Sequence, residues 1–478
     1  MAVRTGPVAG PELPIALERD SGVPLREQLA RELRERIRSG RLPKDARLPG
    51  SRPLAAELGV ARNVVVDAYA QLIAEGYLST TQGAPTRVAL AIAHTPPRRA
   101  VSSIPAPLAY DFHPGLPDLG AFPHDRWLRS LRAAVRAAPL SAMGYGDPRG
   151  MPSLRESLGS YLGRVRGAIA DPERIIVCSG FVQGFALVCR VLRARGIRRV
   201  AMEDPGWIVH RTIARHAGLE PVPIPVDTDG MLIEGIERAR VGAVLLTPAH
   251  QFPTGVVLGA ARRHELLAWA RRHHGLIIED DYDAEYRYDR DPMTALQGLA
   301  AEHVIYIGSA SKRLAPGLKL GWVIVPSTLT DALTHEKALD DGGGEAIGQL
   351  TLANFITSGE LDRHLHRMRL RYRKRRDALL DAVRQWLPDA TVDNTAAGLY
   401  ALVRLPPDTD ESALISAAGH RQVGVTGLYW HHFQPDSAPP GLLLGFANLP
   451  EPAIARGIQL IGEALAETRP ASNHPAPT

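Results

Sequence analysis

Apolar side chains in the first fifth of the chain recur at helical spacing. They occupy every fourth position from residue 25 to residue 37, and Gly40 follows, which predicts an amphipathic helix. Two shorter helices are predicted at 54–58 and 62–75 around a tight glycine turn, as in a helix-turn-helix. Residues 77–90 then predict two short strands, the wing of a winged helix.

From about residue 110 to residue 468 the pattern changes to short apolar strands that alternate with amphipathic helices. This alternation is typical of βαβ units, and it predicts an α/β fold with a mostly parallel sheet and helices on both faces. The clearest strands are expected at 175–180, 199–204, 243–248, 276–281 and 303–309.

Proline, glycine and alanine mark the boundaries of this organisation. The Pro/Gly-rich residues 1–20 and the Pro/Ala-rich tail 469–478 are expected to be disordered. Residues 89–108 are rich in alanine and proline and predict a stiff, extended linker. The linker separates a small module, 21–88, from a large domain, 109–468.

Composition narrows the class of protein. A chain of 478 residues is too long for one ordinary core, and 45% hydrophobic with 22% charged residues is usual for a soluble protein. No apolar run approaches the ~20 residues of a membrane span, and the N-terminus lacks a signal peptide's apolar region. Cys178 and Cys189 are expected to be free core thiols, so the cytoplasm is the expected compartment, and no metal site is expected.

The positive charge is concentrated at the N-terminal end. Residues 21–88 carry eleven Lys or Arg against seven Asp or Glu, which is most of the net charge of +5. A basic module suits a surface that faces phosphates, although charge alone is equally compatible with a solvated helix face.

The module resembles the winged helix of the GntR family. The resemblance rests on SGRLPKDARLPGSRPLAAELGVARNVVVDAYAQLIAEGYL and on the wing GAPTRV, and it covers nearly all of residues 24–88. It implies binding to double-stranded DNA through a set of five residues. These are Arg52, Arg62, Asn63, Gly83 and Thr86.

Three features of the module depart from the GntR pattern. Val64 stands where Thr is usual, Asp67 where a basic residue is common, and Lys44-Asp45-Ala46 replaces a Pro-Gly turn. Val64 removes a possible phosphate contact, and Asp67 would repel phosphate if it faced DNA. Arg62 taken alone is equally compatible with a surface charge, but an arginine at a helix N-terminus is well placed for the major groove.

Lys312 is the residue with the strongest chemical signal. It lies in SASKRLAPGLKLGW, directly after an apolar strand, and this run resembles the Schiff-base segment of fold-type I pyridoxal-phosphate (PLP) enzymes. A lysine at a buried strand end has a lowered pKa and a more nucleophilic amine. Lys312 is therefore the expected catalytic residue, which holds PLP as an internal aldimine.

PLP also needs an acid beside its pyridine nitrogen and a hydrogen-bond donor at O3′. Asp280, in IIEDDYDAEY, is the expected acid, and Tyr282 is the O3′ donor by resemblance. Asp281 could take the place of Asp280, because consecutive strand residues face opposite ways, but the family pattern favours Asp280.

A phosphate cup is expected where the strand at 175–178 gives way to a helix, since backbone N–H groups at a helix N-terminus bind phosphate. Lys319 occupies a position where an Arg normally clamps the phosphate, and Lys lacks the guanidinium fork. Trp207 resembles the ring that stacks on the pyridine, with a core Trp as the alternative. The other expected cup residues are Gly180, Phe181, Val182, Ser309 and Ser311.

Two further motifs, YGDPRGMPSLRESLGSYLGRVRG and LLTPAHQFPTG, extend the resemblance to residues 24–468. The whole chain resembles the MocR/GabR family, which fuses a GntR winged helix to an aminotransferase-like domain. The resemblance implies a fold-type I domain with a smaller α+β subdomain, and a head-to-tail homodimer. In such dimers the residue corresponding to Tyr145 reaches the partner's PLP phosphate.

Two departures from working aminotransferases bear on function. Phe252 stands where transaminases have the Asn that bonds O3′, and Leu443 stands where they place the Arg that grips the substrate carboxylate. His250, His431 or His432 could take a carboxylate, but single histidines are more often core or surface residues. Ordinary transamination is therefore expected to be poor.

We expect a PLP-dependent transcription regulator that senses an amine, an amino acid or PLP itself. The first alternative is a functional aminotransferase with a vestigial DNA-binding domain, favoured by the intact Lys312, Asp280 and Tyr282. The second is a DNA-binding protein whose large domain serves only as a dimer scaffold.

Overall fold

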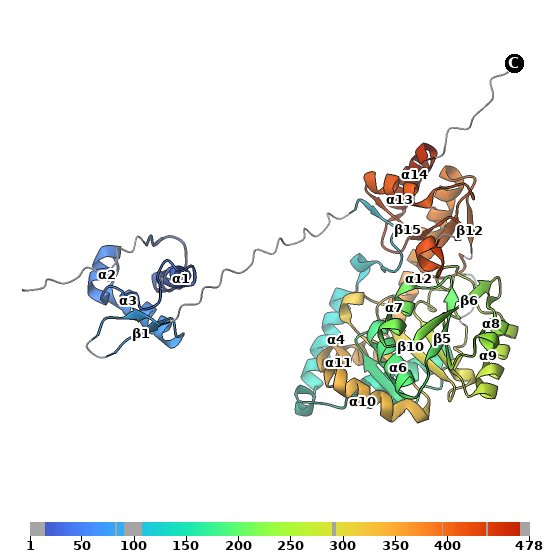
Figure 1. The fold of residues 1–478 in the computed structure, drawn as a ribbon, viewed down its shortest axis with the longest axis horizontal. Coiled ribbons are helices and arrows are strands. Elements are labelled where there is room, and N and C mark those ends of the chain that lie inside the picture. The colour runs from blue at the N-terminus through green and yellow to red at the C-terminus, as the bar shows by residue number, and fades with distance from the viewer. Residues whose placement is uncertain are drawn as a thin grey trace, which may run out of the picture. The chain divides into compact units, whose positions relative to one another are not determined.

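The computed structural model describes residues 15–81, 84–89, 108–288, 293–393, 395–435 and 438–468. The chain divides into two compact units, Met1–Ala106 and Pro107–Thr478, and each is described by itself (Figure 1). Residues 1–14, 90–107 and 469–478 lie outside the described residues. The predictions of a disordered start, a stiff linker and a disordered tail fall mainly on them.

The first unit is a helix-turn-helix with a two-stranded wing, as the apolar pattern predicts. Gly59 ends its second helix in the left-handed conformation, with φ of 64°, which makes the tight turn possible. Leu78 pairs with Val88 in antiparallel register at the base of the wing. The elements are α1 (Leu25–Arg38), α2 (Ser51–Leu58), α3 (Arg62–Ala74), β1 (Leu78–Ser79) and β2 (Arg87–Val88).

The N-terminal segment corrects one predicted boundary. Disorder was expected up to residue 20, but Ile15 packs in the hydrophobic core of the first unit. The Gln28 side chain bonds the backbone of Glu18 in both directions, at 2.9 Å and 2.8 Å. The Arg19 guanidinium donates to the carbonyl of Gly59 at 2.7 Å. These contacts could not be predicted from the Pro/Gly-rich composition of the segment, because the partner residues lie elsewhere in the sequence.

The second unit is built on an eight-stranded sheet with the order β4-β11-β10-β9-β8-β5-β6-β7. The sheet is mostly parallel, since only β11 and the hairpin strand β7 run antiparallel to their neighbours. The strands are β4 (Ile175–Cys178), β5 (Arg199–Asp204), β6 (Glu220–Asp227), β7 (Gly230–Met231), β8 (Ala243–Leu246), β9 (Leu276–Asp281), β10 (Val304–Ser309) and β11 (Gly321–Ile324).

Helices cover both faces of this sheet, which confirms the predicted fold class. Side chains alternate along each strand, so Ile176 packs on one face and Ile175 on the other. The first face is covered by α6 (Phe181–Ala194), α7 (Ile208–His216) and α10 (Thr330–Asp341). The second is covered by α5 (Pro152–Arg166), α8 (Ile233–Ala239), α9 (Ala260–His273), α11 (Ala346–Thr357) and α12 (Glu360–Trp386). Helix α4 (His124–Ala137) packs against α11.

A smaller α+β subdomain follows α12 and lies at the upper end of the second unit in Figure 1. Its antiparallel sheet has the order β12-β13-β16-β15, and α14 packs against α12. Its elements are β12 (Thr391–Asp393), β13 (Tyr400–Arg404), α13 (Glu411–His420), β14 (Val423–Gly424), β15 (Thr426–Gly427), β16 (Gly441–Gly445) and α14 (Glu451–Thr468).

The first described strand of the second unit, β3 (Tyr110–Asp111), also belongs to this subdomain. It pairs in parallel with β14, and Phe112 N–H donates to the carbonyl of Gly424 at 2.8 Å. The chain then turns toward the large sheet. Cys178 and Cys189 are free and buried, as predicted. Among the described residues no helix is long and apolar enough to cross a membrane.

Candidate functional site

The carboxyl ends of the parallel strands surround a cavity of about 460 Å³. This edge of an open α/β sheet is where ligands usually bind. Nearly all of the residues expected to hold PLP line it. They are Gly180, Phe181, Val182, Trp207, Asp280, Tyr282, Ser309, Ser311, Lys312 and Lys319.

Lys312 lies in the turn that follows β10, and its amine donates a hydrogen bond to the carbonyl of Gly115. Burial lowers the pKa of this amine, and the carboxylates of Asp283 and Asp280 oppose that shift. The Tyr286 hydroxyl donates to the Lys312 carbonyl at 3.0 Å and fixes the backbone. The result is a positioned amine with a larger neutral, nucleophilic fraction than a surface lysine has.

Strand β9 ends with Asp280 and Asp281, and only one of these two side chains faces the cavity. Asp280 lines it, and its Oδ2 lies 3.0 Å from Nε2 of His210. Burial raises the pKa of Asp280, while the hydrogen bond from His210 opposes the shift. Asp281 points to the other side of the sheet, where Arg166 binds both of its oxygens, at 2.9 Å and 3.1 Å.

Tyr282 also lines the cavity, and its hydroxyl already has several partners. It donates to the carbonyl of His250 at 2.9 Å and lies 3.2 Å from the Tyr400 hydroxyl. Burial raises the pKa of Tyr282 well above its usual value, so the hydroxyl stays protonated. Asp283 binds Nδ1 of His250 at 2.8 Å. His250 therefore supports Tyr282, and this arrangement leaves it poorly placed to bind a carboxylate.

The N-terminus of α6 lies at the wall of the same cavity. Gly180 precedes the helix with φ of 113°, a conformation that favours glycine, and the next backbone N–H groups begin the helix. Ser309, Ser311 and the exposed Lys319 line the same cavity. One cavity thus combines a buried amine, a carboxylate, a tyrosine hydroxyl and a helix N-terminus, which is a donor set that fits PLP.

The structure also reveals lining residues that the sequence did not indicate. Gly115, His210 and Tyr400 approach the predicted residues from segments between 70 and 197 positions away.

Leu443 is fully buried in an apolar cluster with Tyr400, Leu402 and Leu428. The described cavity lining contains no arginine.

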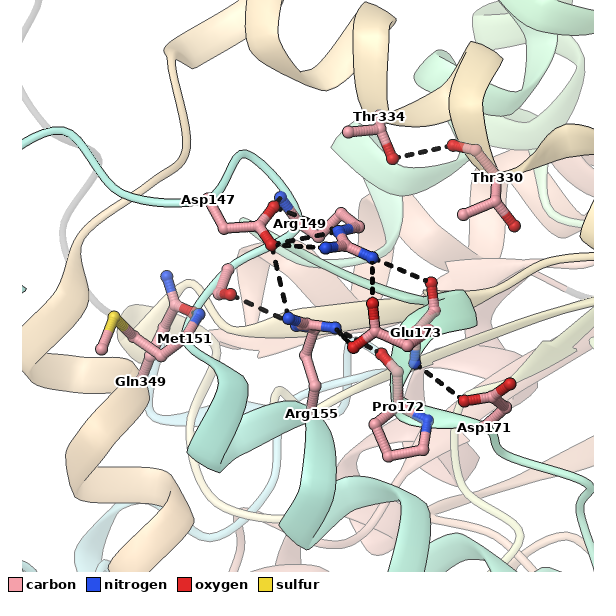
Figure 2. Close-up of polar contacts among 11 residues, drawn as sticks. Asp147, Arg149, Met151, Arg155, Asp171, Pro172, Glu173, Thr330, Thr334 and Gln349 are labelled. Carbon is pink, nitrogen blue, oxygen red and sulfur yellow. Dashed lines mark hydrogen bonds and ion pairs between the residues drawn. The ribbon is translucent and has the colours of Figure 1, made fainter.

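Tyr145 is the predicted site residue that this cavity does not include. It is fully exposed, on a segment held by the ion pairs shown in Figure 2. Asp147 and Glu173 bind Arg149 at 2.7 Å and 2.6 Å. The buried Arg155 lies 3.4 Å and 3.0 Å from the same two carboxylates. The segment that carries Tyr145 is therefore anchored, while its ring points away from the core.

The predicted DNA-binding residues lie on the surface of the first unit. Arg52, Arg62 and Asn63 are exposed at the starts of α2 and α3, and Thr86 is half-buried in the wing. The Arg62 Nε donates to the Ser51 hydroxyl at 3.2 Å, which joins the two helix starts. Gly83 lies outside the described residues.

Both units match known protein families. Residues 25–88 match the bacterial regulatory proteins of the gntR family, and residues 119–440 match the aminotransferases of class I and II. The chain is 33% identical to the probable rhizopine catabolism regulatory protein MocR of Rhizobium meliloti, over 94% of this chain and 95% of that one. The chain belongs to the MocR-type GntR regulators.

A second relative and a solved structure support the same family assignment. The chain is 32% identical to the pyridoxine biosynthesis transcriptional regulator PdxR of Corynebacterium glutamicum, over 95% of this chain and 99% of that one. The kynurenine aminotransferase of Pyrococcus horikoshii superposes with a TM-score of 0.69 at 26% identity, over 76% of this chain and 91% of the enzyme. A MocR-type protein with these two domains is a DNA-binding, PLP-dependent transcription regulator.

Proposed function

We propose that this regulator holds PLP on Lys312 and senses a ligand amine that enters the same cavity. The observation that carries the proposal is the convergence of Lys312, Asp280 and Tyr282 on one cavity of about 460 Å³. PLP would supply an electrophilic aldehyde and an electron-accepting ring. Asp280 would face the pyridine nitrogen, Tyr282 would donate to O3′, and Trp207 would stack on the ring.

The phosphate would lie at the N-terminus of α6, with Ser309, Ser311 and Lys319 around it. We further propose a homodimer that acts on DNA in the cytoplasm. The exposed Tyr145 on its anchored segment supports this proposal, since its place in the family pattern is at a partner's phosphate. Among the described residues that line the cavity there is no arginine for a substrate carboxylate, which favours a sensor over an efficient transaminase.

An absorbance titration tests the sensing role. Purified holoprotein is titrated with a panel of amines, with and without a 2-oxo acid, while the visible band of the cofactor is followed. A sensor should show a spectral shift that reaches a plateau and consume less than one equivalent of oxo acid. Consumption of the donor and the oxo acid over many cycles would instead identify a working aminotransferase.

Arg62→Ala should weaken DNA binding by about 10- to 100-fold, because one good arginine contact to a base is worth about 1–3 kcal/mol. The visible band of the cofactor should not change, since Lys312 belongs to the other unit. Binding to the chain's own upstream DNA can be measured by fluorescence anisotropy at several salt concentrations. Arg31→Ala, on an exposed position of α1, is the matched control. Equal losses in both variants would mean that Arg62 contributes only charge.

A further inference from the structure

The longest described helix of the second unit carries a marked excess of positive charge. Helix α12 contains nine Lys or Arg against four Asp or Glu, and none of the four lies between Asp362 and Asp377. This excess of five is larger than that of the winged-helix residues 21–88, where eleven basic residues stand against seven acidic ones. Blocks of like charge repel one another, so they are typical of surfaces that bind a partner of opposite charge.

Part of this charge forms an exposed stripe along the helix. Arg363, Arg367, Arg371 and Lys374 follow one another at intervals of four, four and three residues, so they lie on one side of α12. All four residues are exposed. At a rise of about 1.5 Å per residue, the stripe is roughly 17 Å long. These four residues are called the α12 stripe below.

At the N-terminal end of the stripe, one carboxylate serves two arginines. Glu360 binds Arg363 at 3.0 Å and Arg126 of α4 at 2.6 Å. Burial lowers the pKa of Arg367, and the charges of Arg126 and Arg363 lower it further, while Glu360 opposes the shift. Because Arg126 contributes more to this shift than Glu360 does, the charge around Arg367 is positive on balance.

The remainder of the stripe is also incompletely neutralised. Asp118 is shared by Arg371 and the buried Arg375, with a distance of 2.9 Å to each. Within the described chain, no ion pair reaches Arg367 or Lys374. The stripe therefore keeps a positive charge that the described carboxylates do not balance.

Double-stranded DNA is the anion that complements this stripe best. The chain is a DNA-binding regulator, so a duplex is already its partner. A duplex carries about one negative charge per 1.7 Å, so about ten phosphate charges run along a stripe of this length. Arginine, which provides three of the four cations, binds phosphate oxygens with two parallel hydrogen bonds. An anionic membrane suits the stripe less well, because the apolar face of α12, with Leu361, Leu365 and Met368, is buried in the core.

We propose that the α12 stripe binds the phosphate backbone of double-stranded DNA, as a second contact surface in addition to the winged helix. Contacts to phosphates add affinity but carry no sequence information. The stripe thus strengthens binding to any duplex that extends beyond the segment read by the winged helix. The inference uses the DNA binding of the family and not the proposed sensing of an amine, so the two can fail separately.

The salt dependence of DNA binding tests the stripe. A triple variant with Arg363→Gln, Arg367→Gln and Lys374→Gln removes three charges and leaves Arg371, whose partner Asp118 is only 11% exposed. Full-length protein is titrated into the chain's own upstream DNA, and into an unrelated duplex of equal length, at several salt concentrations. The slope of log affinity against log salt should become shallower by about 0.9 per lost phosphate contact, which is about 2–3 in the triple variant. Affinity should fall by the same factor for both duplexes.

Two further variants separate a phosphate contact from a general effect of charge or of folding. Arg195→Gln, Arg271→Gln and Arg272→Gln together remove the same charge from exposed positions of the second unit outside α12. This matched control should keep the original slope. Arg367→Gln alone removes a cation that has no ion pair in the described structure, so it should fold normally and make the slope shallower by about one.

Three results would overturn the inference. The first is an unchanged slope in the stripe variants, and stripe-dependent binding to anionic lipid vesicles together with that result would identify a membrane as the partner. The second is an equal change of slope in the matched control, which would mean that only net charge matters. The third is a monomeric stripe variant in sedimentation where the original protein is a dimer, since the stripe would then be an interface between copies of the chain.

Discussion

Lys312→Ala should abolish the visible band of bound PLP and leave no cofactor that borohydride can fix to the protein. The reason is that the described cavity lining contains two lysines, Lys312 and Lys319, and Lys319 is exposed. Burial lowers the pKa of the Lys312 amine, which makes this amine a good nucleophile. Absorbance spectra and mass spectrometry after reduction measure the two effects.

DNA binding without effector should survive this substitution, because α3 and the wing belong to a separate compact unit. Lys312→Arg is a useful second variant, since it keeps a cation beside Gly115 but cannot form the covalent link. In the absence of PLP, the free energy of unfolding of both variants should stay within about 1 kcal/mol of the original protein's value. Thermal unfolding measures it. A reduced adduct that persists in either variant would show that a different lysine carries the cofactor.

Asp281→Asn should destabilise the second unit by about 3–5 kcal/mol, because it leaves buried positive charge without its partner. Asp281 is 1% exposed, and the side chain of Arg166 that binds it is 2% exposed. The Tyr306 hydroxyl also donates to Asp281, and Arg313 lies 3.6 Å away. Denaturant unfolding followed by tryptophan fluorescence measures the loss, with Trp322 in the same core as a reporter.

Asp280→Asn is the matched control one position earlier, and the opposite result is expected. Burial raises the pKa of Asp280, so its ionised form is costly in the fold and the neutral amide should cost little stability. PLP retention should fall instead, since the amide cannot keep the pyridine nitrogen protonated. Equal stability of the two variants, or loss of cofactor by Asp281→Asn at low temperature without unfolding, would contradict the division of roles.

The strands and the functional residues at their ends could be predicted, because both follow from residues that are adjacent in the sequence. An apolar run such as LIIEDD carries both its burial and the carboxylates that follow it, and the structure places β9 at Leu276–Asp281. The same holds for the helix N-terminus after Gly180 and for Lys312 after β10. Period-2 alternation also explains why Asp280 and Asp281 face opposite sides.

The remainder of the site depends on contacts between distant segments. Nothing near Asp280 in sequence indicates that His210 supports it, and Gly115 gives no sign that its carbonyl holds Lys312. His431 was weighed in the sequence beside His250 and His432 without a basis for choosing among them. The folded chain decides this only for His250, whose Nδ1 is bound by Asp283.

The segment from β3 to Gly115 limits where proteins of this fold can tolerate insertions and deletions. It is pinned at one end by Phe112, whose N–H binds Gly424 and whose carbonyl accepts from Gly445 at 2.7 Å. It is pinned at the other end by the bond from Lys312 to the Gly115 carbonyl. A single inserted residue between these anchors would carry that carbonyl away from the amine. Insertions and deletions should therefore accumulate before Leu108 and be absent from 110–115, and a foreign DNA-binding unit is best grafted upstream of Leu108.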